Sequence, residues 1–323
     1  MKLDLYDKKL LYHLDINSRY SLNELAKKLR LSKNAVNYRL KNLVKRGIIT
    51  QFYTTINVKN LEYSYFKVYF KLQNTTEKQE KEIINYFTTK VPSLWVNTLD
   101  GRYDLMVGIL AGSIDEFYKI LNDSINKFRT YIQSYDIFIV IYAPHFKKDY
   151  LLESKKIEQK IEEFGGIPRI IKIDETDKTI LKQISTNARI QIVDLASKIN
   201  STVDIVRYRI KKLKENGIIQ GFRISINYPK LGYQLYKLLI TTQDINEETE
   251  KEIINYCNSQ SNIVDIITRG IGPWNIEIQI DAKDNQEFHS IFKDFKNKFN
   301  SIIKSYETLI MINEYKMDYF PFN

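Results

Sequence analysis

The sequence predicts an α+β protein made of two tandem copies, each joining a (winged) helix-turn-helix unit to a ferredoxin-like β-α-β-β-α-β unit. An internal repeat is the first observation behind this prediction. Residue n matches residue n+170 without a gap from Asp4, opposite Asp174, to Tyr86, opposite Tyr256, and a one-residue insertion follows. The second observation is periodicity, because each copy begins with helical spacing and continues with alternating strands and further helices.

The repeat and the periodicity together divide the chain into five segments. These are a first helix-turn-helix unit (1–57), a first ferredoxin-like unit (62–143), a helical linker (144–171), a second helix-turn-helix unit (172–227) and a second ferredoxin-like unit (232–317).

The composition is that of a globular protein with a polyanionic partner. The 323 residues suit two or more domains, and 43% of them are hydrophobic and 27% charged. The net charge of +10 favours a polyanion. The single cysteine, Cys257, excludes an internal disulfide and a thiolate metal cluster. The chain starts without an apolar signal core, and its longest apolar stretch, 137–142, is far shorter than a bilayer span. We therefore expect a cytoplasmic protein that contacts no membrane.

The start of the first copy reads as three helices. Residues 3–14 have helical period, and Ser21 with Glu24 forms a capping box for a second helix. Ser32 is suited to cap a third helix, which Gly47 ends in the left-handed position. A tight turn between the last two helices is helix-turn-helix geometry.

The third helix predicts a DNA-reading face. Val36, Leu40 and Leu43 form its buried stripe. The opposite face lacks acidic residues and carries amide and cationic groups, which can bond base edges and phosphates. The early residues of the helix are expected in the major groove, whereas Lys41 and Lys45 are expected at phosphates. The candidate DNA contacts are Ser32, Lys33, Asn34, Asn37, Tyr38, Arg39, Lys41 and Lys45.

The second copy repeats this scaffold with a different reading face. Thr202 takes the cap position, and Val206, Ile210 and Leu213 form the stripe expected to be buried. Asp204 stands where the first copy has Asn34, so we expect either a different half-site or weaker binding. The candidate contacts are Thr202, Val203, Asp204, Arg207, Tyr208, Arg209 and Lys211.

The positive charge is concentrated in the two helix-turn-helix units. Residues 1–57 hold 12 Lys and Arg against 4 Asp and Glu, and residues 172–227 hold 11 against 6. The two units therefore carry more positive charge than the whole chain, as phosphate neutralisation requires. The alternative interpretation of this charge is a lysine-rich helix face that is exposed to solvent and does not bind DNA.

The second part of each copy has the strand and helix order of a ferredoxin-like unit. One face of such a sheet carries its helices, and we expect the other face to pair with the sheet of the second copy. In the first copy the predicted elements are strands at 65–72, 94–99, 105–110 and 134–142, with helices at 77–89 and 114–128; the second copy repeats them between 235 and 314.

The segment between the copies is expected to be a helical connector. It has apolar residues at helical spacing, namely Tyr150, Ile157, Ile161 and Phe164. The pair Gly165-Gly166 and Pro168 would end that helix.

Each copy resembles the Lrp/AsnC (leucine-responsive, feast/famine) regulators over nearly its whole length. The residues that carry the resemblance are Leu3-Asp4-x-x-Asp7, Leu31-Ser32, Arg39-Leu40-x-x-Leu43, Gly47-Ile48-Ile49 with Ile56-Asn57, and the turn Asp100 to Leu105. The resemblance implies ferredoxin-like domains that pair and bind an amino acid-like effector between dimers. It places that site near Gly101, Tyr103 and Asp104, for which a simple structured turn is the alternative.

This chain departs from the family in two ways. The family has one copy per chain, so a single chain is expected to form a pseudo-dimer, and further homo-oligomerisation is left open. In the second copy Asn275 stands where Asp104 stands, after Pro273. That exchange puts effector binding by the second copy in doubt.

Two rival functions remain. Sirohaem decarboxylases share the two-domain architecture but carry histidine and arginine around the turn before the third strand, whereas 97–102 here lacks histidine. His13, His145 and His289 are scattered, and the sequence has no nucleophile-base set, metal-ligand spacing or phosphate loop, so we expect no catalytic residue, metal or cofactor. The second rival is an architectural protein that compacts DNA. We expect double-stranded DNA as the partner of a regulator.

Overall fold

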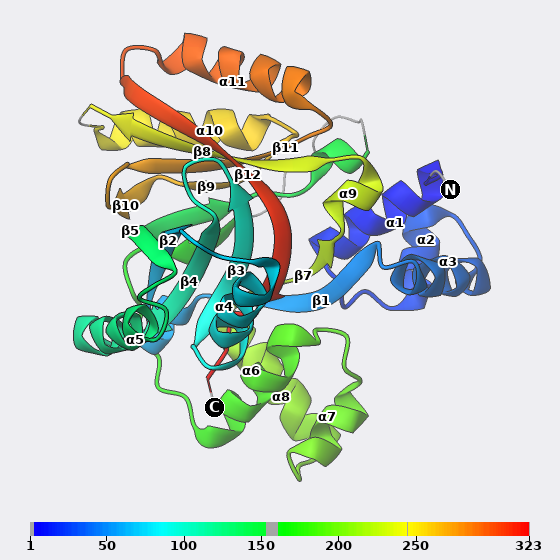
Figure 1. The fold of residues 1–323 in the computed structure, drawn as a ribbon. Coiled ribbons are helices and arrows are strands. Elements are labelled where there is room, and N and C mark those ends of the chain that lie inside the picture. Colours follow the sequence, from blue (N-terminus) through cyan, green and yellow to red (C-terminus); the bar gives the residue numbers. More distant parts are fainter. Residues whose placement is uncertain (1–2, 153–160, 244, 323) are drawn as a thin grey trace.

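The structure, a computed structural model, describes residues 3–152, 161–243 and 245–322. Two helical heads flank a central body of sheets and helices (Figure 1). Head 1 is α1 to α3 and head 2 is α6 to α8. None of the helices in the described ranges is both long enough and apolar enough to cross a membrane.

The first copy follows the predicted order of elements. They are α1 (Leu5–Ile16), α2 (Leu22–Leu29), α3 (Lys33–Lys45), β1 (Ile49–Ile56), the 3-10 turn η1 (Val58–Leu61), β2 (Ser64–Leu72), α4 (Glu77–Thr89), β3 (Ser93–Asp100), β4 (Leu105–Ala111), α5 (Ile114–Lys127) and β5 (Ile132–His145).

The second copy repeats the first with one interruption. After η2 (Asp149–Leu151) and β6 (Glu162–Gly165) come α6 (Glu175–Thr186), α7 (Ile192–Lys198), α8 (Val203–Glu215), β7 (Ile219–Ile226), α9 (Tyr228–Leu231), β8 (Gln234–Thr242), α10 (Glu247–Ser259), β9 (Ile263–Ile267), β10 (Arg269–Ile271), β11 (Ile276–Ala282), α11 (Asn285–Phe299) and β12 (Ile303–Met317). The strand equivalent to β3 is thus divided at Thr268 into β9 and β10.

The helix boundaries in head 1 follow from the local sequence. The Ser21 hydroxyl accepts from the Glu24 amide and the Glu24 carboxylate accepts from the Ser21 amide, so the predicted capping box is confirmed. Ser32 caps α3 through the amide of Ala35. Gly47 follows α3 with φ +62°, which is why a residue without Cβ suits this position.

A two-stranded antiparallel ribbon, β1 with β7, joins the heads. Each head packs on the strand of the other copy: Ile224 and Ile226 of β7 lie in the core of head 1, and Tyr53 of β1 lies in a core with the helices of head 2. Arg19 donates to the Ala188 carbonyl, and Arg189 donates to the Tyr20 carbonyl. These reciprocal contacts hold the bases of the two heads together.

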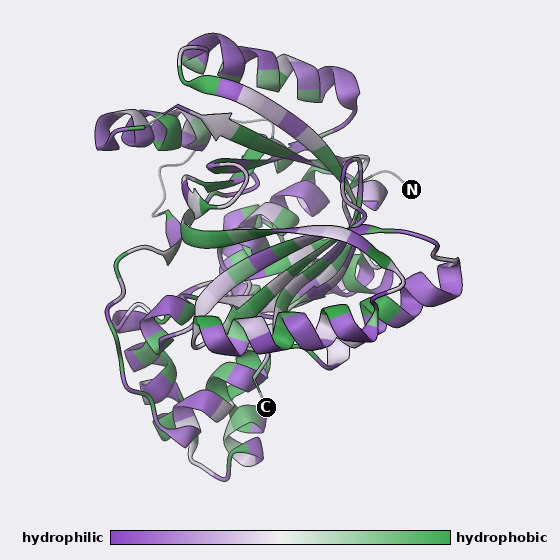
Figure 2. Ribbon diagram, turned by 60° about the vertical axis from the view of Figure 1, so that its left-hand side comes forward, coloured by the Kyte–Doolittle hydropathy of each residue, from purple (hydrophilic) through white to green (hydrophobic). Residues whose placement is uncertain are grey.

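The two ferredoxin-like sheets continue into one another through their edge strands, whereas the sequence predicted only that the face without helices is covered by the other sheet. The order is β10-β5-β2-β4-β3-β12-β8-β11-β9, and β5 also meets β9. Apolar residues on the outer face of the first sheet pack under α4 and α5, and those of the second pack under α10 and α11. In Figure 2 the green, hydrophobic positions lie on the strands and on the helix sides that face them.

The two seams between the sheets differ in extent. At one seam β3 runs against β12 from Asp100 to Trp95. At the other, β5 meets β9 at one pair, His145 with Asp265, and β10 continues beside β5. The break at Thr268 therefore makes the second seam discontinuous.

The expected helical linker is wrong in the part that the structure describes. Residues 162–165 form β6, which pairs with β5 and buries Phe164, and Tyr150 lies in the short 3-10 turn η2. Ile157 lies outside the described residues. The helical spacing of the apolar residues was misleading because the unpaired edge of β5 supplies backbone partners that a periodicity argument cannot see.

Candidate functional site

The exposed face of α3 collects the predicted reading residues of head 1. Val36, Leu40 and Leu43 are buried, as predicted. The exposed residues on the other side are Ser32, Lys33, Asn34, Tyr38, Lys41 and Lys45, and Asn37 is half-buried among them. Tyr38 is 73% exposed, which is unusual for an aromatic side chain and leaves its ring free to meet a partner.

The corresponding face of α8 carries a different charge pattern. Asp204 forms an ion pair with Arg207 at 3.4 Å, and Lys211 forms one with Glu215 at 3.7 Å. Thr202 and Tyr208 are exposed, with Tyr208 at 63%. These cations face carboxylates on their own helix, so less of their charge is available to a polyanion.

Val203 does not belong to the reading face, contrary to the prediction. Its side chain is half-buried and packs against the core beneath head 2. The first residue after an N-cap lies beside the turn that enters the helix, so an apolar side chain there turns toward the head. Ile210, expected to be buried, is likewise half-buried against that core.

Arg39 and Arg209 are held inside their own heads, which argues against the predicted DNA contacts. The Arg39 guanidinium donates to Asp4 and Asp7 at 2.7 Å each. Arg209 repeats this with Asp174 at 2.7 Å and Asp177 at 3.0 Å. The pattern Asp-x-x-Asp therefore fastens the first helix of each head to its third, and the repeat of all three residues was a signal for that role.

The turn between β3 and β4 is filled by contacts within the chain. Asp104 accepts from Lys71 Nζ at 2.9 Å and from the Leu72 amide at 2.7 Å. Tyr103 is buried, and its hydroxyl donates to Asp136 at 2.6 Å. Gly101 has φ +130°, and a Cβ there would lie 2.9 Å from Leu309.

Asn275 makes the hydrogen bond in the second copy that corresponds to the bond of Asp104 in the first. Its side-chain oxygen accepts from the Thr242 amide at 2.9 Å, as Asp104 accepts from Leu72. An amide oxygen serves as well as a carboxylate for this bond. The exchange of Asp104 for Asn275 is thus explained by the turn itself, and the geometry favours the structured-turn interpretation of these residues.

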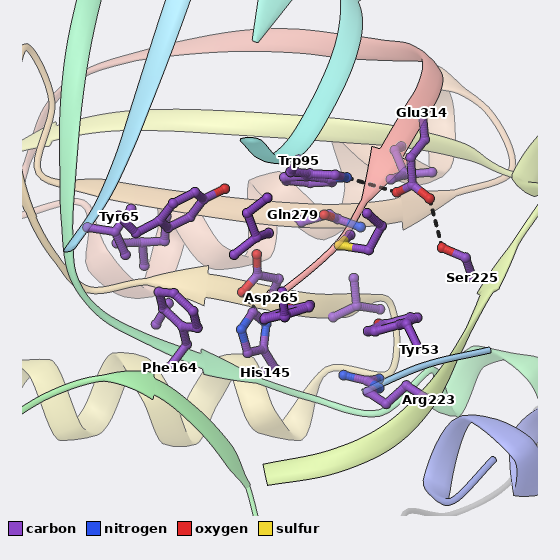
Figure 3. A pocket seen from close by; sticks show the side chains of 18 of the residues that line it. Tyr53, Tyr65, Trp95, His145, Phe164, Arg223, Ser225, Asp265, Gln279 and Glu314 are labelled. Carbon is purple, nitrogen blue, oxygen red and sulfur yellow. Dashed lines mark hydrogen bonds and ion pairs between the residues drawn. The ribbon is translucent and has the colours of Figure 1, made fainter. Parts of the chain in front are cut away.

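The closed sheets and the β1–β7 ribbon enclose a cavity of about 80 Å³ that sequence reasoning did not find (Figure 3). Its walls come from both copies. His145 Nδ1 lies 3.0 Å from Asp265 Oδ1 on this wall, so one of the histidines expected to be scattered faces the cavity. Arg223 and Lys148, also on the wall, both contact the buried carboxylate of Asp15.

Two equivalent lysines share one carboxylate beside the cavity. Lys67 and Lys237, which occupy matching positions in β2 and β8, lie 2.5 and 2.9 Å from Glu277 Oε1, and all three side chains are buried. Burial alone would raise the pKa of Glu277, but the two ammonium groups outweigh it and lower the pKa to about 2. A lysine in the middle of two otherwise apolar strands was the sequence signal for this cluster.

No group of three or more His, Cys, Asp or Glu side chains within 3–152, 161–243 and 245–322 is arranged to hold a metal ion.

Comparison with known families matches the two heads directly. The family described as "Winged helix-turn-helix DNA-binding" matches residues 3–50 and 173–220, which are the corresponding parts of the two copies. The match therefore covers α1 to α3 and α6 to α8, the helices whose exposed faces are described above.

Curated relatives match the length of one copy. The transcriptional regulator LrpA of Pyrococcus horikoshii is 32% identical over 139 residues, which is 43% of this chain and 96% of LrpA. The chain belongs to the Lrp/AsnC family of transcription regulators. A second relative, an uncharacterised HTH-type transcriptional regulator of Pyrococcus abyssi, is 33% identical over 132 residues, which is 39% of this chain and 85% of its own length.

One solved structure resembles the whole double copy. The siroheme decarboxylase NirDL has a TM-score of 0.61 and covers 98% of this chain and 96% of its own, at 13% sequence identity. At that identity the likeness shows that this Lrp/AsnC chain shares the paired fold of NirDL, and it shows nothing about activity.

Proposed function

We propose that this protein is a sequence-specific, double-stranded DNA-binding transcription regulator whose single chain acts as a covalent pseudo-dimer. The observation that carries the proposal is the exposed face of α3, where Lys33, Lys41 and Lys45 accompany two asparagines without any carboxylate. The family match at both heads supports it. A regulator of this kind acts where the chromosome lies, so we place it in the cytoplasm.

Linkage in one chain favours bivalent binding. The β1–β7 ribbon and the reciprocal arginine contacts fix the bases of both heads relative to one another. When one head is bound, the other is therefore held at a high effective concentration near the same duplex. The two unlike faces are expected to select two unlike half-sites, separated by one helical turn or a multiple of it.

The test is selection of bound sequences from random duplex DNA at several salt concentrations. Enrichment of a motif with two unlike half-sites is the expected result. Tight binding without an enriched motif would support a DNA-compacting role instead, and continuous footprints would agree with that. No binding at low salt would overturn the proposal.

Asn37→Ala tests base reading in particular. We expect the variant to lose about 1–3 kcal/mol on the selected site and little on unrelated DNA, because an amide can pair two ways with adenine. Arg207→Ala alters the matching position of head 2 and serves as the comparison. An equal loss on every sequence would assign Asn37 to the phosphate backbone.

An enzyme of the siroheme decarboxylase type is the second candidate, favoured by the fold shared with NirDL. We propose against it, because sequence relatives that cover most of their own length are named regulators. Titration with an iron porphyrin provides the test. A stoichiometric shift in the porphyrin absorption spectrum would support the enzyme, and an unshifted spectrum is expected.

A further inference from the structure

Glu314 is distinguished from the other carboxylates around the central cavity by its partners. Its two oxygens accept from neutral donors, the Trp95 indole at 2.9 Å and the Ser225 hydroxyl at 2.7 Å (Figure 3). Asp15, Asp265 and Glu277 each have a basic side chain within 4 Å, whereas no basic side chain in the described ranges lies that close to Glu314. The cavity wall therefore presents one carboxylate without a basic group within ion-pair distance, and Lys148 on the same wall acts on it from further away.

Aromatic rings surround this carboxylate. Trp95, Tyr53, Tyr228 and Tyr319 line the same cavity, and the rings of Tyr53 and Tyr319 are stacked at 5.8 Å. Burial raises the pKa of Tyr228 most, and the charges of Asp281 and then Glu314 raise it further, which places Glu314 close to this part of the wall. Aromatic faces attract cations through their quadrupole, most strongly when water is excluded.

Three tyrosine side chains that line the same cavity have hydroxyl groups without a hydrogen-bond partner in the described ranges. Tyr53, Tyr65 and Tyr319 are 6%, 7% and 6% exposed, and none of their hydroxyls has a hydrogen-bond partner among the residues that the structure describes. These hydroxyls are therefore able to bond a ligand in the cavity, and about 80 Å³ has room for roughly five water-sized positions.

We propose that the Glu314 end of the cavity binds a small organic ammonium ion. The carboxylate supplies the counter-charge, and the rings of Tyr53, Tyr228 and Tyr319 are the aromatic surfaces offered to the cation, because the Trp95 ring already lies 4.9 Å from Lys237 Nζ and 5.5 Å from Lys67 Nζ. The tyrosine hydroxyls accept from its N–H groups. Four to six non-hydrogen atoms fit the space.

A groove gives this site a route from solvent. The groove, about 400 Å³ in volume, is bordered by residues of β12, α9 and β8 and shares Tyr228, Leu235 and Glu314 with the cavity. Glu314 lines both the groove and the cavity, and it is an exposed residue. A ligand can therefore reach the carboxylate without separation of the two sheets.

The site also touches the ribbon that carries the heads. Tyr53 belongs to β1 and Ser225 to β7, while Trp95 and Glu314 belong to the β3–β12 seam. A bound cation would interact with the same carboxylate that accepts a hydrogen bond from Ser225. Its binding would therefore weaken or reorient the contact between Glu314 and strand β7 of the ribbon. The coupling rests on the proposed DNA-binding function, since it makes the ammonium ion an effector of head placement.

Isothermal titration of the full chain with n-butylamine at neutral pH tests the site, with 1-butanol as the neutral match. We expect saturable, one-to-one binding of the amine and none of the alcohol. Glu314→Gln should weaken amine binding about tenfold or more, because a charge-assisted contact is lost. Glu307→Gln, on the same strand but paired with Arg102, should leave binding unchanged.

Trp95→Phe keeps a ring but removes the indole N–H that holds the Glu314 carboxylate in place, so a severalfold weaker affinity is expected even if Glu314→Gln fails to fold. Equal binding of amine and alcohol, or binding unaffected by Glu314→Gln or Trp95→Phe in a folded protein, would overturn the site. A gel shift with selected DNA tests the coupling separately. Amine binding with unchanged DNA affinity would overturn the coupling alone, and amine binding without any DNA binding would overturn the regulator.

Discussion

The two copies share a scaffold and differ in where they carry charge. On the reading faces, head 1 has Lys33, Lys41 and Lys45, whereas the same positions of head 2 are Val203, Lys211 and Glu215. On the inner faces of the sheets, by contrast, the second copy carries more acidic and polar side chains than the first.

The second copy carries acidic or polar residues toward the enclosed space where the first is apolar or small. The aligned pairs are Trp95 and Asp265, Met106 and Glu277, Gly108 and Gln279, and Ala143 and Glu314. The first copy therefore has the more basic exposed helix face, and the second supplies more of the acidic side chains of the interior.

The comparison teaches that a duplicated unit can divide tasks that a symmetric dimer must repeat. In a symmetric pair every charge occurs twice, so two Glu277 side chains would meet two lysines. In this chain one carboxylate serves Lys67 and Lys237 together, and one Glu314 faces the cavity. Four predictions test this division, from the largest expected effect to the smallest.

Removal of the shared carboxylate should have the largest effect. Glu277→Gln removes the ion-pair partner of Lys67 and leaves Lys237 only its longer pair with Asp265 at 3.7 Å, so we expect a loss of about 3–5 kcal/mol in the free energy of unfolding. Glu307→Gln, which breaks a partly exposed pair with Arg102, should cost less than about 1 kcal/mol. Urea denaturation measures both, and similar costs would contradict the asymmetry.

The pH dependence of the same variant gives a second readout. The folded-state pKa of Glu277 is about 2, below its ordinary value of 4.5. Its stabilising contribution is therefore complete above about pH 4.5 and is lost as the pH falls toward 2. The wild-type protein should lose more stability across that window than Glu277→Gln does.

Charge removal in head 1 should weaken DNA binding next most strongly. Lys41→Ala combined with Lys45→Ala is expected to lower affinity about 30-fold near 0.15 M salt and to flatten the salt dependence by about two units. The matched pair in head 2, Lys211→Ala with Glu215→Ala, leaves the net charge unchanged and should not alter the slope. Equal slopes for the two double variants would mean that the heads contribute alike.

The arginine–aspartate ion pairs are common to both heads, so their removal should lower the stability of the protein by the same amount in either head. Arg39→Gln and Arg209→Gln each remove a guanidinium that joins two aspartates, and each should cost about 1 kcal/mol of stability. The amide of Asp177 and the Arg209 guanidinium both lower the pKa of Asp174, consistent with this pairing. Thermal unfolding measures the costs. Retained stability with a loss of DNA binding would instead return these arginines to the reading face.

The smallest expected effect has the opposite sign. Asp204→Asn places the amide of head 1 in head 2, removes a charge that repels phosphate and frees Arg207 from its 3.4 Å pair. We expect a gain in DNA affinity of about twofold to fivefold, measured by gel shift on nonspecific duplex. A lower affinity would show that Asp204 itself accepts from a base.

Much of the architecture was readable from the sequence because it rests on local rules. Caps at Ser32 and Thr202, the capping box at Ser21 and the periodic stripes of α3 need only neighbours within a few residues. The predicted strands and helices of the sensing units are confirmed for the same reason. Because the pattern repeats at a fixed offset, each cap and each buried stripe is seen twice in the sequence, which strengthens every prediction based on it.

The sequence by itself determined the repeat, the heads and the order of strands and helices along the chain, and the tertiary structure decided how the strands join and what the side chains contact. Arg39 reads as a DNA contact until the fold brings Asp4 and Asp7 to it, and β6 reads as helix until β5 offers an edge. His145, Arg223 and Glu314 are far apart in the chain and meet only where the sheets close. Periodicity reports which face of an element is apolar, whereas a buried polar site depends on which elements face each other, and that follows from long-range packing alone.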